Sequence, residues 1–305
     1  MRAKDTKRRS LAAHVLRWYA RHGRDLPWRH TSEPYRILLS ETMLQQTQVA
    51  RVLEKYPAFL NRFPSLPALA RAPRSAVVHA WSGMGYNNRA VRLHRLALRV
   101  VQNGGTLPRD PAALHRLPGV GAYTRDAVCA FAYRRRVPVV DVNVRRVLSR
   151  LSGRMRDTAS LLPEAEVRRI AAELLPERRY YAWNQALMDL GATVCTARRP
   201  ACDTCPVARH CRSRGGMREA RKKPRREPSM RGVPNRIYRG RLVEELRRAP
   251  RGRALPAAML GRRILPGFGE AQHRWLGGIL AGLERDGLVR VRGNSALTRR
   301  KVSLA

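Results

Sequence analysis

The chain has 305 residues, of which 62 are Lys or Arg and only 22 are Asp or Glu, so its formal net charge is +40. This excess predicts a polyanionic partner such as nucleic acid, although a proteome rich in arginine would also raise the charge. No segment approaches the roughly 18 consecutive apolar residues of a membrane span, and residues 1–10 are basic without an apolar signal core. We therefore expect a monomeric cytoplasmic protein that associates with the nucleoid and makes no membrane contact.

The region from Leu11 to Met188 has the pattern of an all-α fold. Apolar residues recur at intervals of three and four, Pro and Gly interrupt the pattern, and no run alternates as a strand would. A helical region of about 200 residues is large for one domain, which favours two lobes with a cleft between them.

Glu41 interrupts an apolar helical stripe in this region. On a helix it lies between Ile37 and Leu38 on one side and Leu44 on the other. A carboxyl group among apolar neighbours loses its hydration, so we expect Glu41 to stay protonated and to serve as a proton donor. The alternative is a Glu at the edge of the core that reaches solvent.

The string Leu117-Pro-Gly-Val-Gly121 lies between two predicted helices, Ala112 to Leu117 and Ala122 to Tyr133. Its two glycines permit a tight turn and the close approach of a phosphate. The N–H groups at the start of the second helix would then hold DNA without reading its bases. The alternative is an ordinary corner between two helices.

Asp141 follows the apolar pair Val139-Val140 and precedes Asn143-Val-Arg-Arg-Val-Leu, so it is well placed to cap the N-terminus of a helix. The helix N-terminus also favours an ionised carboxylate, which can stabilise a positive charge that develops beside it. A protonated Glu41 and an ionised Asp141 would form a complementary pair of acid and anion. The sequence leaves open whether Asp141 activates water, acts electrostatically or forms a transient covalent bond.

Four of the five cysteines, Cys195, Cys202, Cys205 and Cys211, have the spacing C-x6-C-x2-C-x5-C. Thiolates this close in sequence suit one metal centre, either a tetrahedral zinc ion or an iron–sulfur cluster. Zinc sites usually contain two separated C-x2-4-C pairs, whereas only one tight pair is present here. The ligand type alone leaves both metals open, and a disulfide framework is the weakest alternative.

The segment from Ser213 to Asn235 is rich in Arg, Lys, Gly and Pro and predicts a solvated linker. From Ile237 the apolar pattern resumes, and Leu288-Val-Arg-Val-Arg, followed by Gly293-Asn294 and Leu297, predicts a hairpin. Helices followed by a hairpin are typical of a winged-helix module. The inward-facing helix positions are Leu242, Val243 and Leu246, then Trp275, Leu276, Ile279, Leu280 and Leu283, with a short segment between them near Leu255 to Leu260.

These motifs resemble the helix-hairpin-helix (HhH-GPD) DNA glycosylase superfamily and, within it, the adenine DNA glycosylase (MutY) family. The resemblance covers about Leu11 to Cys211, and the Met-Leu-Gln-Gln-Thr-Gln string points to the adenine branch rather than to siblings that excise thymine or oxidised pyrimidines. The matching strings, which follow the family's order, are Leu26-Pro-Trp-Arg29, Ser40-Glu-Thr-Met-Leu-Gln-Gln-Thr-Gln-Val49, Gly83-Met-Gly-Tyr86, Leu117-Pro-Gly-Val-Gly121, Asp141-Val-Asn143, Asn184-Gln-Ala-Leu-Met-Asp-Leu-Gly191 and the four cysteines.

The resemblance implies a two-lobed all-α glycosylase domain over residues 1–212, with a [4Fe-4S] cluster loop at 195–211. A basic linker at 213–235 and a small winged-helix-like α+β module at 236–305 would follow, the module serving DNA binding or another accessory role. The Nudix-like C-terminal domain with which the family recognises 8-oxoguanine is not expected in this chain.

The resemblance also implies roles for individual residues. Glu41 would protonate the departing adenine at N7, and Tyr123, in place of the lysine of bifunctional members, implies a monofunctional enzyme that leaves an intact abasic strand. Gln46 and Tyr86 would push into the base stack after the nucleotide is rotated out, the alternatives being a surface amide and a packing aromatic. The complete set comprises catalytic Glu41, Tyr123, Asp141 and Asn143; DNA-binding Gln45, Gln46, Tyr86, Leu117, Gly119, Val120 and Gly121; adenine-pocket Trp28 and Arg29; and cluster ligands Cys195, Cys202, Cys205 and Cys211.

We therefore expect a base excision repair enzyme that acts on double-stranded DNA containing a mismatch or an oxidised base, releasing adenine opposite 8-oxoguanine or guanine. Two departures from the family pattern, Val142 in place of glycine and Asn87 in place of a second aromatic, bear on the opposite-base preference more than on the chemistry. A thymine or uracil mismatch glycosylase and a noncatalytic iron–sulfur DNA-binding regulator are the alternatives. The two carboxyl groups argue against the regulator, because a pure binder gains nothing from carboxylates near phosphates.

Overall fold

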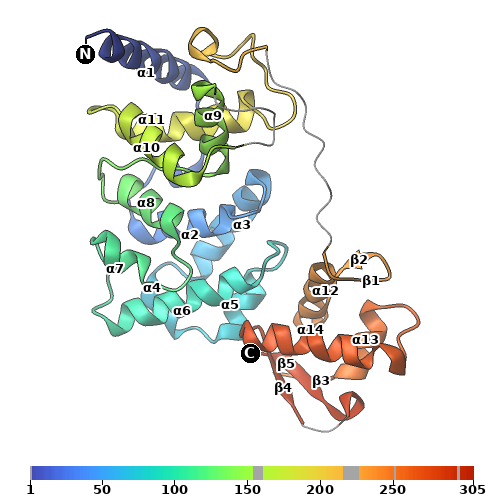
Figure 1. Cartoon of the computed structure of the whole chain (residues 1–305). Coiled ribbons are helices and arrows are strands. Elements are labelled where there is room, and N and C mark those ends of the chain that lie inside the picture. The colour runs from blue at the N-terminus through green and yellow to red at the C-terminus, as the bar shows by residue number, and fades with distance from the viewer. Residues whose placement is uncertain (1, 154–160, 216–226, 251, 294–295) are drawn as a thin grey trace. The chain divides into compact units, whose positions relative to one another are not determined.

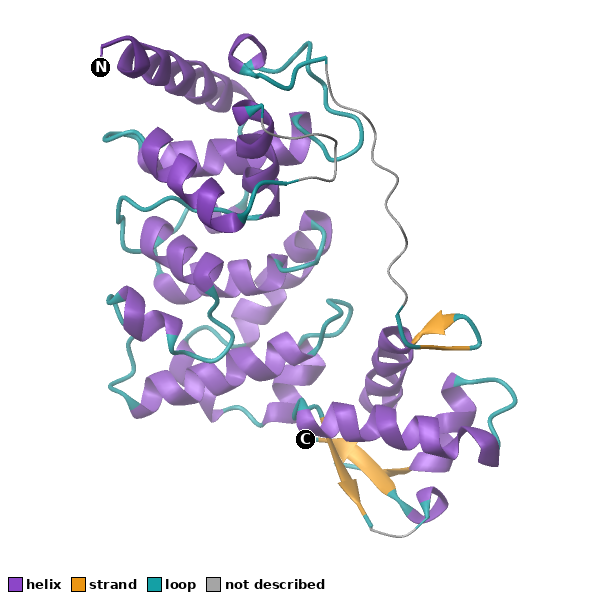
Figure 2. Ribbon diagram, viewed as in Figure 1, coloured by secondary structure: helices purple, strands orange, loops and turns teal. Residues whose placement is uncertain are grey.

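The computed structural model describes residues 2–153, 161–215, 227–250, 252–293 and 296–305, with side chains described from Arg8 onward. The chain divides into two compact units: Met1–Ile37, Pro108–His115 and Val120–Pro224 form unit 1, and Leu38–Leu107, Arg116–Gly119 and Arg225–Ala305 form unit 2. Helices dominate both units, and the strands of the described chain all lie toward its C-terminal end (Figure 1, Figure 2). None of the described helices is both long and apolar enough to cross a membrane.

Unit 1 has a hydrophobic core shared by its first helix and the helices that precede the cysteines. Val15, Val144 and Trp183 are buried together in this core, where α1 packs against α11. Its elements are α1 (Arg2–His22), η1 (Pro27–Arg29), the first residues of α2 (Pro34–Leu44), α7 (Pro111–His115), α8 (Ala122–Phe131), α9 (Val142–Ser152), α10 (Glu164–Leu174), α11 (Tyr180–Asp189), the π-helical turn η2 (Leu190–Val194) and η3 (Ala208–His210).

The first part of unit 2 is helical, as the sequence predicts. Phe59 packs edge-on against the fully buried Trp81, with ring centroids 5.7 Å apart. Apolar residues at helical spacing place one face of each helix in the core, and α4 packs along α6. Besides the end of α2, the elements are α3 (Val49–Arg62), α4 (Leu66–Arg71), α5 (Arg74–Ala80) and α6 (Asn88–Gln102).

The C-terminal part of unit 2 combines helices with a three-stranded antiparallel sheet in the order β3-β5-β4. The order of elements confirms the winged-helix-like arrangement, and the first strand of the predicted hairpin is β4, which pairs with β5, with Val291 opposite Val302. The predicted return through Leu297 is wrong, because Leu297 lies in the 3-10 turn η5 and the return strand begins at Lys301. The predicted inward helix positions are buried except for Trp275, which is partly buried. The elements are β1 (Ser229–Met230), β2 (Val233–Pro234), α12 (Asn235–Arg248), β3 (Leu255–Pro256), α13 (Ala257–Ile264), η4 (Glu270–Gln272), α14 (His273–Arg285), β4 (Val289–Arg292), η5 (Leu297–Arg299) and β5 (Lys301–Leu304).

The predicted linker differs from the structure at its C-terminal end. Strands β1 and β2 pair there as a short antiparallel ladder, and Asn235 already begins α12. Backbone hydrogen bonding makes this ladder, and the Arg- and Pro-rich composition of the segment gives no sign of it. Residues 216–226 of the predicted linker and Asn294 of the predicted turn lie outside the described residues.

The C-terminal part of unit 2 shares its hydrophobic core with α5 and α6. Val78 of α5 and Val91 of α6 belong to the same buried cluster as Leu246, Leu276 and Leu288. The winged-helix-like elements are therefore packed onto the helical part of unit 2 by apolar burial, which is the main favourable contribution to folding.

Candidate active site

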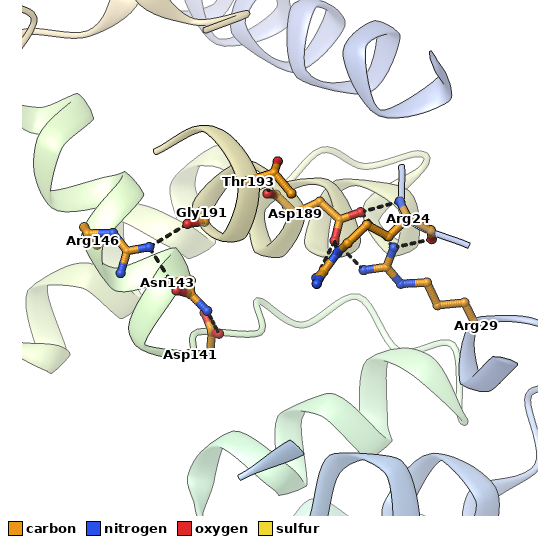
Figure 3. A network of polar contacts seen from close by, with 8 residues as sticks. All are labelled: Arg24, Arg29, Asp141, Asn143, Arg146, Asp189, Gly191 and Thr193. Atoms are coloured by element: carbon orange, nitrogen blue, oxygen red, sulfur yellow. Dashed lines mark hydrogen bonds and ion pairs between the residues drawn. The ribbon is translucent and has the colours of Figure 1, made fainter. Parts of the chain in front are cut away.

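Asp141 caps the N-terminus of α9, as the sequence predicts. Its backbone is extended, and its Oδ1 accepts a hydrogen bond from the Val144 N–H at 2.7 Å. Its Oδ2 accepts a second hydrogen bond from the Asn143 side-chain amide at 2.9 Å (Figure 3). The cap satisfies a backbone N–H that has no partner within the helix, so the start of α9 holds the carboxyl group in one orientation.

Burial raises the pKa of Asp141 above its ordinary value. The Val144 N–H, the Asn143 side chain and backbone, and the positive charge of Arg146 lower the pKa, but their combined effect is smaller than that of burial. The helix N-terminus thus lowers the pKa of Asp141 as expected, but the loss of hydration raises this pKa by more. A poorly hydrated carboxylate gains more from a positive charge that develops beside it than a hydrated one does.

A chain of hydrogen bonds connects Asp141 to the start of the cysteine loop. The Arg146 guanidinium donates to Asn143 Oδ1 at 2.9 Å and to the Gly191 carbonyl at 2.6 Å (Figure 3). Its Nε also donates to the Cys195 carbonyl at 2.8 Å. Gly191 is required for this approach, because a Cβ there would lie 2.7 Å from the Cβ of Asn143. The carboxyl group, α9, η2 and the first predicted cluster ligand are therefore held as one assembly.

The four predicted ligands, Cys195, Cys202, Cys205 and Cys211, line one small cavity together with Arg150. The buried Arg150 guanidinium donates to the Cys195 Sγ at 3.3 Å, which connects α9 to this side of the cavity. Burial is the main reason that the pKa of Cys205 is raised to about 11, and the other three cysteines add to the shift. Four thiolates gathered here need a compensating cationic centre.

The four thiols line one cavity, an arrangement that suits the ligands of a [4Fe-4S] cluster. Within the described part of the chain, no three His, Cys, Asp or Glu side chains are gathered as ligands of one metal ion. The ligands of a [4Fe-4S] cube bind four different corners, so they surround a cavity and need not converge on one point.

Glu41 lies on α2 and is buried, with 5% of its surface exposed. Its neighbours Ile37 and Leu38 are buried as well. The expectation that a carboxyl group interrupts an apolar helix face is confirmed, and the alternative of a Glu that reaches solvent is wrong. Glu41 belongs to unit 2, whereas Asp141 belongs to unit 1, and the catalytic role of each is still a prediction.

Gln46 and Tyr86, the residues predicted to enter the base stack, lie in two turns of unit 2. Both have a left-handed backbone, with φ values of 58° and 44°, which is costly for residues other than glycine. Tyr86 is 49% exposed and Gln46 is also exposed, while Gln45 is half-buried. A strained backbone that presents exposed side chains is typical of functional turns, and it requires support from the surrounding structure.

The buried guanidinium of Arg89 supplies that support. Desolvation lowers its pKa to about 10, so it is still charged at neutral pH. It joins the end of α2, whose last carbonyls have no partner within the helix, to the turn that precedes α6. Nη1 donates to the carbonyls of Thr42, Met43 and Gln45 at 2.9, 2.8 and 2.5 Å, and Nη2 donates to Thr47 Oγ1, Met84 O and Gly85 O at 2.9, 3.0 and 3.1 Å.

The predicted hairpin forms a tight turn. Gly119 has a φ of +82°, and a Cβ there would lie 3.1 Å from the Cβ of Arg92, so glycine suits this position on both counts. Leu117 and Val120 are buried, whereas Gly121 is exposed and directly precedes α8. Contact of the hairpin's backbone N–H groups with DNA is still a prediction. Tyr123 follows on α8 and is partly buried.

Trp28 and Arg29, the predicted adenine-pocket residues, lie in η1, and Trp28 is buried. Arg29 forms a bidentate ion pair with the fully buried Asp189, with N···O distances of 2.7 and 2.8 Å (Figure 3). Burial alone would raise the pKa of Asp189, but the hydrogen bonds and charges of Arg29 and Arg24 outweigh it and lower the pKa. The contact of these residues with adenine is still a prediction, and the structure shows that Arg29 also joins η1 to α11.

Three buried residues that organise the site were not identified from the sequence: Arg89, Arg146 and Asp189. Each lies inside or beside a string that matches the family, namely after Gly83-Met-Gly-Tyr86, after Asp141-Val-Asn143 and within Asn184 to Gly191. A charged residue at an inward-facing helix position was the available signal, the same one that identified Glu41.

We expect Arg89→Lys to lower the free energy of unfolding by about 2–4 kcal/mol, because an ammonium with three N–H groups cannot replace the forked guanidinium among these acceptors. Urea denaturation of the purified protein measures this change. Arg99→Lys, on the exposed face of the same helix, is the matched control and should have little effect. Equal stability of the two variants would contradict the supporting role of Arg89.

We expect Asp141→Asn to be at least as stable as the parent near neutral pH, since Asn also caps helices and carries no buried charge. Asp141→Ala loses the cap and should be less stable by about 1 kcal/mol. Because the folded-state pKa of Asp141 is raised, folding favours its protonated form, so the parent should lose stability relative to Asp141→Asn as the pH rises through that pKa. Melting temperatures measured across the acid range test this, and an Asn variant that is less stable than the Ala variant would contradict it.

Two family models match the chain. The model for the HhH-GPD superfamily base excision DNA repair protein matches residues 39–177, and the model for the iron-sulfur binding domain of endonuclease III matches residues 195–211. The second match contains all four cysteines of the cavity, so the cofactor is the predicted [4Fe-4S] cluster. Neither match extends beyond residue 211.

Individual proteins agree with these matches. The adenine DNA glycosylase of Mycobacterium tuberculosis (strain ATCC 25618 / H37Rv) is 44% identical over 239 residues, which cover 77% of this chain and 78% of that protein. A solved thermostable thymine-DNA glycosylase is similar with a TM-score of 0.63 and 30% identity, covering 69% of this chain and 98% of that one. A trapped endonuclease III–DNA covalent intermediate has a TM-score of 0.60 at 22% identity, covers 68% of this chain and 95% of that one, and shows the shared fold alone.

These similarities agree with the motif order and with the cysteine cavity. The chain belongs to the adenine DNA glycosylase family, within the HhH-GPD superfamily of base excision DNA repair proteins.

Proposed function

We propose that this protein is a monofunctional DNA glycosylase that hydrolyses the N-glycosidic bond of adenine mispaired with 8-oxoguanine or guanine in double-stranded DNA. Its membership of the adenine DNA glycosylase family supports the choice of base. The observation that carries the chemistry is Glu41, a buried carboxyl group within the family-matching string from Ser40 to Val49. The formal net charge of the whole chain, +40, suits a duplex substrate.

Glu41 is the general acid in this proposal. In this proposal the buried carboxyl group of Glu41 donates the proton that the leaving adenine needs at N7. Protonation there makes the base a better leaving group and weakens the bond to the sugar.

Asp141 is the anion that stabilises the oxocarbenium-like sugar. Its cap bond to Val144 and its hydrogen bond from Asn143 fix the direction of the carboxylate before the reaction begins. A preorganised anion needs no reorientation when positive charge develops on the sugar, and this is the usual origin of electrostatic catalysis. Asn143 is thus a positioning residue, and Arg146 orients Asn143 in turn.

Tyr123 supports hydrolysis rather than strand cleavage. A phenol cannot form the Schiff base that a lysine forms at this position in bifunctional relatives. The product would be free adenine and an unbroken strand with an abasic site.

Cys195, Cys202, Cys205 and Cys211 would hold the [4Fe-4S] cluster and so fix the loop at residues 195–211. When bound, the cluster would neutralise part of the charge of the thiolates. Arg146 and Arg150 donate to the Cys195 carbonyl and Sγ, so the chain itself connects the loop to α9. The cysteine thiolates take no part in the proton transfer from Glu41.

A thymine mismatch glycosylase is the second candidate, supported by the 30% identity to a solved thymine-DNA glycosylase over 98% of that chain. It would use the same buried Glu41 and capped Asp141, so the acid and the anion do not distinguish the two candidates. The identity of the released base does.

We expect Glu41→Gln to slow base excision by about 10²–10⁴-fold while duplex binding changes little, because an amide keeps the shape of the side chain but cannot donate the proton. Single-turnover excision and fluorescence anisotropy measure the two effects. The matched control is Glu54→Gln on the exposed face of α3, which should retain the parent rate. Excision by Glu41→Gln at the parent rate would rule out Glu41 as the acid.

We expect the protein purified without oxygen to contain roughly four irons per chain and to absorb broadly near 400 nm. Cys202→Ser should lose iron and bind duplex more weakly, whereas Cys129→Ala should retain both properties, since Cys129 is buried in α8 and does not line the cavity. Iron analysis and absorbance spectra of the two variants test this. Stoichiometric zinc in a colourless parent protein would contradict the assignment.

A further inference from the structure

The structured residues after Cys211 are anchored to the turn that carries Tyr86. Arg247 of α12, whose side chain is 7% exposed, donates two hydrogen bonds to the Val78 carbonyl at 3.1 and 2.8 Å and one to Asn87 Oδ1 at 2.8 Å. Glu244, one helical turn earlier, pairs with Arg247 at 3.0 Å and accepts a hydrogen bond from the Ser82 hydroxyl at 3.3 Å. Buried polar contacts and the shared apolar core thus fix α12 beside Tyr86.

Asn87 gives one of the departures from the family pattern a physical explanation. A second aromatic at this position would offer no carbonyl oxygen to Arg247. The Asn87 amide supplies that acceptor, so this residue couples the Tyr86 turn to α12. The C-terminal elements and the turn therefore depend on each other in this chain.

Next to this contact is a groove built jointly by the turn, α12 and the end of α14. We call it the Tyr86 groove; its lining includes Tyr86, Asn87, Arg236, Ile237, Arg239 and Arg285. Among the described residues that line the groove, Asp286 has the one carboxylate, and it is already paired with Arg239. Arg236 pairs with Glu227 at 2.9 Å, and Arg285 is exposed with no hydrogen bond or ion pair to any described residue. The groove therefore carries a net positive charge.

The groove also exposes apolar surface. Tyr86 is 49% exposed and Ile237 is 37% exposed, and both line the groove with the arginines. Guanidinium groups next to an exposed aromatic ring are the combination that holds a phosphate backbone while a ring contacts bases. An acidic peptide would form ion pairs with the arginines but has no bases to stack on the Tyr86 ring.

The exposed face of α14 argues against an independent reader of sequence. In helix-turn-helix proteins, the helix equivalent to α14 enters the major groove and reads base edges with long polar side chains. On α14 the exposed positions between Arg274 and Arg285 are Gly278, Ala281 and Glu284, and none of these three side chains can donate a hydrogen bond to a base. Contacts made by this part of the chain would therefore be with the backbone.

We infer that the Tyr86 groove binds the phosphodiester backbone of duplex DNA beside the base step at which Tyr86 inserts. The winged-helix-like elements then act as a backbone clamp that is mechanically joined to the inserting turn through Arg247 and Asn87. This inference rests on the proposed DNA substrate, but it does not depend on which base is excised.

The test compares two double variants of the full chain with equal loss of charge. The groove variant, Arg236→Gln with Arg285→Gln, removes one paired and one unpaired arginine from the groove. The control variant, Arg248→Gln with Arg262→Gln, removes one arginine of each kind outside the groove. Arg248 pairs with Glu245, and Arg262 is an exposed residue of α13. Equilibrium binding to a fluorescent duplex that contains no excisable base is measured over a series of salt concentrations. All four side chains are exposed, so matching melting temperatures will show that both variants are folded.

The groove variant should bind at least about tenfold more weakly at low salt, and the slope of log K against log salt should fall by about 2, because two phosphate contacts and their released counterions are lost. The control variant should bind within about twofold of the parent. Equal losses in both variants would show that only total charge matters, and no loss in the groove variant would assign the groove to another partner; either result overturns the inference. Failure of the proposed function would look different, with the parent binding duplex but releasing no adenine.

Discussion

The carboxyl group at the start of α9 is the constraint around which unit 1 is arranged. The role that we propose for Asp141 requires a poorly hydrated carboxylate that is held still despite the cost of burying it. The Val144 N–H and the Asn143 amide meet both needs, and Arg146 extends the support to Gly191 and Cys195. Hydrogen bonds therefore connect Asp141 and the start of α9 to η2 and to the first residue of the cysteine loop.

In unit 2, buried arginines connect segments that are distant in the sequence. Arg89 joins the end of α2 to the turn of Tyr86, and Arg247 joins that turn to α12 through Asn87 and Val78. In each case a forked guanidinium donates to backbone carbonyls of a turn or of a helix end. Part of the excess positive charge is therefore structural, which qualifies the argument from composition: not every arginine is available to a polyanion.

Local patterns in the sequence predicted a large part of this structure. The periodicity of apolar residues predicted the helical region and the buried stripes of α12 and α14, and the residues around Asp141 predicted its cap. Glu41 could be identified because a carboxyl group at an inward-facing position breaks the pattern of its own helix. The hairpin of β4 and β5 was visible as an alternating run followed by a turn.

What the sequence did not predict depends on contacts between distant segments. Arg89 reaches a carbonyl 47 residues away, and Arg29 pairs with Asp189, 160 residues away. No local pattern encodes such pairs, because they exist only once the helices are packed. The direction of the pKa shift of Asp141 also required the structure, since the helix terminus and burial act in opposite directions and only the degree of burial decides between them.

The most direct test of the account is the identity of the base that the parent protein releases. Duplexes carrying A, T or U opposite G or 8-oxoguanine are incubated with the protein, the released base is identified by mass spectrometry, and the strands are examined before and after alkali. The account predicts free adenine from the two adenine mispairs, with strands that break only after alkali. Release of thymine or uracil instead, strand cleavage without alkali, or no release from any duplex would contradict it.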